Sequence, residues 1–187
     1  MRHVYHGSNM SFLKVIKKHN STHKRNWVYA SYSKEVALIF ISKQGNDLFY
    51  SLSFDGKNYP IELVERKPLM FKKIFNCSGY IYKLDASNFM EGQTGWPAEV
   101  VSNTDEEVIS FEYIDNVYDE LIKLDNEGLI KLYLYPNRPD YVPLDNSDLI
   151  FKVLRWYDNG FDIDNFYNIY PELKDKFLKK LKRVKRN

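Results

Sequence analysis

Short β-favouring runs recur along this chain, and the helical patterns between them are few. These runs, rich in branched and aromatic residues, lie at 4–8, 27–31, 48–54, 59–64 and 129–135. The clearest helical periodicity spans 114–125, where apolar residues recur near every 3.6 positions before Gly128. Short strands with a few interleaved helices indicate an α+β fold rather than a repeated β–α–β array. No glycine-rich phosphate-binding or dinucleotide loop follows any run, which argues against a doubly wound nucleotide fold.

The remaining elements are predicted from local signals. Ser33 is a plausible N-cap for a helix that ends at 45–47, and Asp55-Gly56 predicts a hairpin turn. Further helices are predicted at 11–18, 148–157 and 164–186. Further strands are predicted within 71–84, at 99–102 and at 108–111, and loops at 19–26 and 88–95.

Composition and the proline pattern predict the domain organisation. The chain has 187 residues, and Pro136, Pro139 and Pro143 follow the last predicted strand. We therefore expect a main domain at 1–135, then a proline-containing connector with a helical extension at 136–187.

The cysteine content and the hydropathy pattern bear on localisation. The single cysteine, Cys77, excludes an intrachain disulfide, and no apolar run approaches the ~20 residues needed to span a bilayer. These features predict a cytoplasmic protein with no membrane partner.

The C-terminal segment is strongly basic. From Lys174 onward it contains eight basic residues and one acid, whereas the whole chain has a formal net charge of +2. One interpretation is contact with nucleic acid through phosphate neutralisation. The other is a solvated helix end whose apolar residues, such as Phe177, dock on the protein. Both interpretations stay open on sequence alone.

Three separate pieces contain residues suited to binding a flat ligand. Tyr5-His6-Gly7-Ser8 joins an imidazole to a glycine that allows close backbone approach. Trp27-Val28-Tyr29-Ala30-Ser31 supplies aromatic rings and hydroxyls, and Trp96-Pro97-Ala98-Glu99 puts a carboxylate before an apolar strand. Each piece alone is more typical of an ordinary strand end, and the combination is what suggests function.

The order and spacing of these pieces resemble the ADP-ribosyltransferase superfamily, in its His-Tyr-Glu branch of diphtheria-toxin-like enzymes and poly-ADP-ribose polymerases. The resemblance covers roughly 1–135 and includes Ser33-Lys34-Glu35-Val36-Ala37 after the tyrosine strand. It implies an ADP-ribosyltransferase-like split β-sandwich with flanking helices, followed by a small helical C-terminal extension. It also implies a glycosyltransferase that uses NAD as substrate, without a metal. The acceptor is then a macromolecule, protein or nucleic acid, or water.

The resemblance also implies roles for individual residues. Gly7 would hold the nicotinamide carboxamide through its backbone, and His6 would bind a ribose hydroxyl. Tyr29 would line the nicotinamide pocket, with Phe40 or Tyr32 as the stacking ring. Glu99 would bind the 2′-hydroxyl and stabilise the oxocarbenium charge. The rest of the expected NAD-binding set is Ser8 with Ser31 or Ser33 as the serine that contacts the carboxamide.

Some features depart from this family. Pro97 stands two residues before Glu99, so the Glu-x-Glu or Gln-x-Glu signature of arginine- or asparagine-modifying enzymes is missing. Two alternatives remain. One is an RNA 2′-phosphotransferase-like enzyme, whose basic His/Arg set is echoed only weakly by Arg2, His3, His6 and Arg25, and the other is a non-catalytic binding module. The His19-x3-His23 spacing is found in metal sites, but no cysteine or catalytic glutamate accompanies it, so no metal is predicted.

Overall fold

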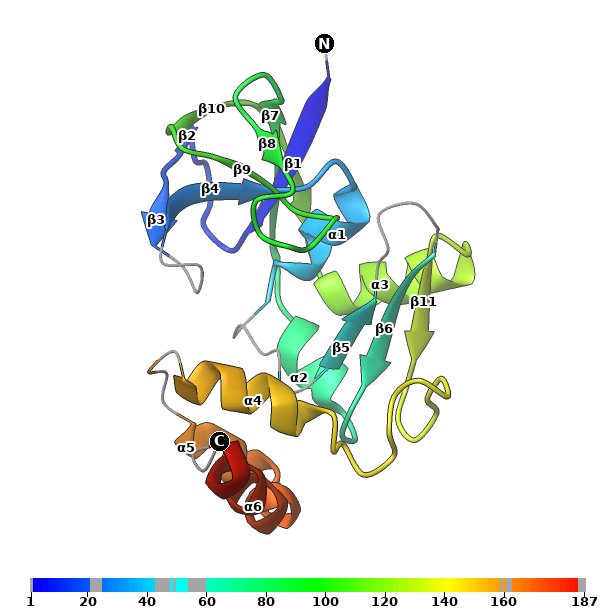
Figure 1. The fold of residues 1–187 in the computed structure, drawn as a ribbon. Coiled ribbons are helices and arrows are strands. Elements are labelled where there is room, and N and C mark those ends of the chain that lie inside the picture. Colours follow the sequence, from blue (N-terminus) through cyan, green and yellow to red (C-terminus); the bar gives the residue numbers. More distant parts are fainter. Residues whose placement is uncertain are drawn as a thin grey trace. The chain divides into compact units, whose positions relative to one another are not determined.

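The computed structural model describes residues 2–20, 25–42, 48, 50–53, 60–158, 160 and 163–184. Contacts divide the chain into two units, Met1–Pro136 and Asn137–Asn187. The boundary predicted from the proline pattern lies one residue earlier. The first unit combines helices with curled antiparallel sheets, as its ribbon shows (Figure 1). The expected α+β class is therefore confirmed.

The first sheet has at one edge a strand near the start of the chain. β1 (His3–Ser8) pairs antiparallel with β7 (Gly79–Asp85). The other edge of β7 pairs with β10 (Glu106–Ile114), whose first residues pair with β2 (Val15–Ile16). The strand order is β1-β7-β10-β2. This order makes β1 an edge of the sheet and leaves its outer side open to another segment.

A second antiparallel sheet shares a hydrophobic core with the first. It contains β3 (His19–Asn20), β4 (Asn26–Ala30), β9 (Val100–Ser102) and β8 (Met90–Glu91), in the order β3-β4-β9-β8. Branched, aromatic and small side chains from both sheets are buried together: Val4, Ile16, Val28, Ala30, Tyr82, Leu84, Ala86 and Val100. This core fixes β1 and β4, the strands that carry His6 and Tyr29.

A third, mixed sheet completes the first unit. β5 (Tyr50–Ser53) is antiparallel to β6 (Ile61–Glu65), and β11 (Ile130–Tyr133) is parallel to β6. The amphipathic helix α3 (Val117–Asn126) precedes β11, and its Asn116 cap accepts hydrogen bonds from two backbone N–H groups. This helix confirms the periodicity seen at 114–125, although Ile114 itself ends β10.

Helix α1 (Lys34–Ile39) packs on β1. Its N-cap is Ser33, as expected, and the Ser33 hydroxyl accepts a hydrogen bond from the Val36 N–H at 3.0 Å. Four consecutive residues, 36–39, are buried. The helix ends at Ile39, earlier than expected. The predicted end at 45–47 lies outside the described residues.

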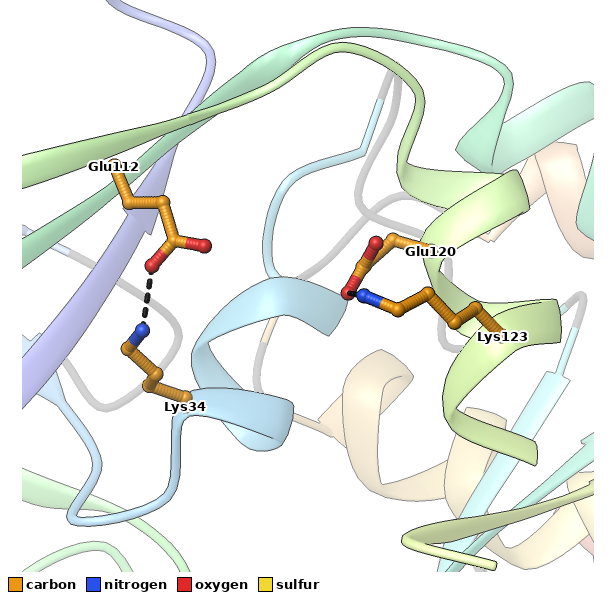
Figure 2. Close-up of polar contacts among 4 residues, drawn as sticks. All are labelled: Lys34, Glu112, Glu120 and Lys123. Carbon is orange, nitrogen blue, oxygen red and sulfur yellow. Dashed lines mark hydrogen bonds and ion pairs between the residues drawn. The ribbon is translucent and has the colours of Figure 1, made fainter. Parts of the chain in front are cut away.

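Figure 2 shows two of the ion pairs on the surface of this unit. Lys34, the first residue of α1, donates to Glu112 of β10 at 2.5 Å, and Lys123 donates to Glu120 within α3 at 2.9 Å. The Glu112 carboxylate raises the pKa of Lys34. Exposed pairs of this kind contribute little to stability. The position of α1 therefore depends mainly on its buried face.

The helix predicted at 11–18 is wrong. Val15 and Ile16 form strand β2 opposite Glu107 and Glu106, because their branched side chains suit a pleated surface. Phe12, just before it, has a φ of 52°, which lies outside the right-handed helical region.

The strand expected at the start of 71–84 is also wrong. Residues Met70–Phe75 form helix α2, and β7 begins only at Gly79. Phe71, Ile74 and Phe75 are buried and have the spacing of one helical face. In this stretch the 3.6-residue period is the local signal that agrees with the structure.

Smaller differences concern strand ends and loops. The predicted loops at 19–26 and 88–95 contain the short strands β3 and β8, which exist through pairing with β4 and β9. The strand predicted at 108–111 is the nine-residue β10. The predicted turn at Asp55-Gly56 lies outside the described residues.

In the second unit, the described residues 137–148 form turns and irregular backbone, and helices follow from Leu149 onward. It contains α4 (Leu149–Asp158), α5 (Asp164–Ile169), a 3₁₀ turn (Pro171–Leu173) and α6 (Lys174–Val184). The single helix predicted at 164–186 is wrong, because Pro171 lacks the N–H that a continuous helix requires. Phe177 is fully buried, with its ring 5.9 Å from that of Phe166. No helix in the described ranges combines the length and apolarity needed to cross a membrane.

Candidate functional site

The candidate site begins where two strands stop pairing. Tyr5 of β1 and Ser31, just after β4, form an isolated antiparallel bridge and exchange both backbone hydrogen bonds, at 2.7 and 2.9 Å. The ladder does not continue to the next pair. In its place, the His6 side chain donates from Nδ1 to the carbonyl of Tyr29 at 2.7 Å. An imidazole therefore occupies the position where backbone pairing would otherwise have continued.

A cavity of about 470 Å³ opens at this split. Its lining comes from segments that are far apart in the sequence: β1 and the residues after it, β3, β4, the C-terminal end of α1 and the residue before β9. The lining residues are Tyr5, His6, Gly7, Ser8, Asn9, Met10, His19, Tyr29, Ala30, Phe40 and Glu99. All three residues predicted to be catalytic, His6, Tyr29 and Glu99, line this cavity, as do Gly7, Ser8 and Phe40 from the predicted NAD-binding set.

The protonation state of His6 follows from its surroundings. Burial lowers the pKa of His6, and nearby His19 lowers it further, while the bond to the Tyr29 carbonyl raises it. Burial has the largest effect, so the ring is neutral near pH 7. A carbonyl can only accept, so Nδ1 must carry the ring proton, and Nε2 is left as an acceptor. His6 can therefore accept a hydrogen bond from a ligand hydroxyl.

The lowered pKa of His6 predicts an acid-sensitive fold. In the unfolded chain His6 titrates near its ordinary value of 6.5, whereas the folded chain resists the proton until a lower pH. As pH falls through this window, the unfolded state binds more protons, so the free energy of unfolding decreases. Urea unfolding at several pH values should show this slope, and His6→Gln should flatten it. Parallel pH curves for the two proteins would contradict the assignment of a neutral His6.

Gly7 allows a helix to pack closely on β1, and its backbone also lines the cavity. A Cβ atom on Gly7 would lie 1.9 Å from the carbonyl oxygen of Ala37 in α1, so only glycine allows this helix to pack on β1. Backbone groups alternate in direction along a strand, and those of Tyr5 point to the Ser31 side. The N–H and C=O of Gly7 therefore point the same way, toward the open split. They offer one donor and one acceptor to a ligand.

A turn holds Glu99 in the lining of the cavity. Its N–H donates to the carbonyl of Trp96 at 3.1 Å, and Ala98 between them is buried. The Trp96 ring lies 6.0 Å from the ring of Phe40, in an edge-to-face arrangement. This contact links the segment of Glu99 to the C-terminal end of α1. Phe40 is 47% exposed and lines the cavity, so part of its side chain is available to a ligand.

Three of the predicted NAD-binding residues are not part of the cavity lining. Ser31 is buried, and its hydroxyl accepts a hydrogen bond from the Ser33 N–H at 3.1 Å. The hydroxyl of Ser33 caps α1 and donates to Glu35 at 2.6 Å. The ring of Tyr32 packs under the guanidinium of Arg2, 3.6 Å from the ring centroid. Each of these three side chains therefore has a structural partner.

His19 also lines the cavity, and its imidazole could take part in chemistry. No role in binding or catalysis was predicted for it from the sequence. It was considered only as a metal ligand with His23, which lies outside the described residues. Its position in the cavity depends on the pairing of β3 with β4, where His19 lies opposite Trp27. No group of three or more possible metal ligands is found within the described ranges. The predicted loop at 19–26 contained no signal that could have placed His19 here.

Comparisons with known proteins do not assign a family. No protein-family model, curated protein or solved structure matches this chain. The argument for function therefore depends on the residues of the cavity.

Proposed function

We propose that this chain is an NAD-dependent ADP-ribosyltransferase-like enzyme and that its first unit has the split β-sandwich fold of that superfamily. It cleaves the bond between nicotinamide and ribose and transfers ADP-ribose to a macromolecule or to water. The observation that carries the proposal is the single cavity lined by His6, Tyr29 and Glu99, which come from three distant segments. Its volume of about 470 Å³ is within the usual range for small-molecule sites.

The backbone and the aromatic rings would bind the nicotinamide half of NAD. The N–H and C=O of Gly7 form a donor–acceptor pair that matches the carbonyl and amino groups of a carboxamide. Tyr29 and Phe40 supply aromatic faces for the pyridinium ring, which is flat and positively charged. The bare Nε2 of His6 accepts a hydrogen bond from a ribose hydroxyl.

Glu99 would supply the charge that bond cleavage needs. When the bond between C1′ and the pyridinium nitrogen breaks, its electron pair goes to nitrogen, and nicotinamide leaves as a neutral molecule. The ribose becomes oxocarbenium-like and positively charged. A carboxylate beside it stabilises this charge in the transition state more than in the bound substrate, where the positive charge is on the leaving ring.

The test is to incubate the purified chain with NAD and to quantify released nicotinamide by chromatography. We expect release above the rate of the protein-free control, together with a rise in melting temperature when NAD is added. Protection by NAD without release would contradict an enzyme and indicate a binding module. Loss of the 2′-phosphate from an RNA carrying that group would contradict the proposal in favour of a phosphotransferase. The described lining contains no Lys or Arg for such a phosphate.

A further inference from the structure

The cavity contains a second imidazole that the proposed cleavage step does not use. His19 is exposed, and its ring lies 5.6 Å from the Tyr29 ring, at 51° to it. His6, by contrast, is half-buried and has one ring nitrogen committed to the Tyr29 carbonyl. The two histidines therefore differ in access: one ring nitrogen of His6 is held by β4, whereas the His19 side chain is open to a molecule arriving from solvent.

Whether transfer of ADP-ribose needs a group that removes a proton depends on the acceptor. An acceptor carboxylate is already ionised near pH 7 and needs no base. A guanidinium holds its proton far too tightly for an imidazole. A hydroxyl becomes a stronger nucleophile when a base takes its proton during attack, and an imidazole has a suitable basicity for this near neutral pH. Glu99 cannot serve both purposes, because its charge is needed at the ribose.

We propose that His19 is the general base for a hydroxyl acceptor, which is water in the hydrolytic reaction and an alcohol in the transfer reaction. This inference rests on the proposed function. The C1′–N bond breaks with its electron pair on the nicotinamide nitrogen. A lone pair of the acceptor oxygen forms the new C1′–O bond, and the acceptor proton goes to a His19 ring nitrogen and then to solvent. The products are neutral nicotinamide and an O-linked ADP-ribose.

The experiment compares nucleophiles that do and do not need a base. Wild type, His19→Gln and Glu99→Gln are incubated with NAD in buffer, in buffer with methanol, and in buffer with azide. Azide is already an anion, so it attacks without losing a proton. For His19→Gln we expect hydrolysis and methanol transfer to fall about 100-fold, the usual contribution of a general base. Azide should restore nicotinamide release and yield azido-ADP-ribose, identified by mass spectrometry.

Control variants separate the possible failures. Asn20→Ala, which changes the neighbouring exposed residue of β3, should behave as wild type with every nucleophile. Glu99→Gln should remain slow even with azide, since its defect is in bond cleavage. If His19→Gln hydrolyses NAD as fast as wild type, or if azide fails to restore release while the variant still binds NAD, the role of His19 is overturned and the proposed function stands. If wild type releases no nicotinamide with any nucleophile, both are overturned.

Discussion

Replacing Glu99 with glutamine is expected to reduce nicotinamide release from NAD by roughly 10²–10³-fold, the usual cost of removing one electrostatic contact to a transition state. Glutamine has nearly the same shape and still offers an oxygen to a ribose hydroxyl, so NAD should still bind. What it lacks is the negative charge opposite the developing oxocarbenium ion. The measurement is the rate of release at saturating NAD, beside the NAD-dependent shift in melting temperature.

The matched control is Glu91→Gln, a carboxylate in β8 that is 63% exposed, pairs with Arg2 and is not part of the cavity lining. We expect its release rate to equal that of wild type. Equal rates for wild type and Glu99→Gln would show that this carboxylate does not act at the ribose. A large rise in the NAD concentration needed for half-maximal rate, with no change in the maximal rate, would assign Glu99 to ground-state binding instead.

Gly7→Ala is expected to lower the free energy of unfolding by about 3 kcal/mol, the upper end of the usual cost of overpacking. The added methyl would lie 1.9 Å from the Ala37 carbonyl oxygen and 3.1 Å from Ile41. The nearest atom is backbone within a buried helix turn, so no side-chain rotation relieves the contact, and α1 must move away from β1. Since proteins are stable by only about 5–15 kcal/mol, the loss should be large in urea unfolding.

Ser8→Ala is the control on the same strand. It adds no atom and removes a hydroxyl that accepts a hydrogen bond from the exposed Met10 N–H, so we expect a loss of about 1 kcal/mol or less. A Gly7→Ala protein as stable as wild type would contradict the tight packing of α1 on β1. The stability comparison is also needed to interpret activity. A loss of activity in Gly7→Ala can come from disrupted packing of α1, even where the backbone of residue 7 could still bind the ligand.

Features governed by neighbouring residues could be predicted from the sequence. The Ser33 cap and the helix at 117–126 depend on hydrogen bonds and periodicity within a few positions. The same local logic failed where two signals competed. At 70–75 a strand was predicted, whereas the 3.6-residue spacing of Phe71, Ile74 and Phe75 gives a buried helical face; at 15–16 a helix was predicted, whereas branched residues pair with β10.

The sequence by itself determined which side chains were available for chemistry: one histidine before a glycine, one tyrosine in a second strand and one glutamate before a third. Only the tertiary structure decided that they line one cavity, that Ser31 and Ser33 are used in local hydrogen bonds, and that His19 joins the lining. The physical reason is that the cavity forms where pairing between β1 and β4 stops after Tyr5 and Ser31. The end of a ladder depends on packing between residues distant in the chain, and no local pattern records it.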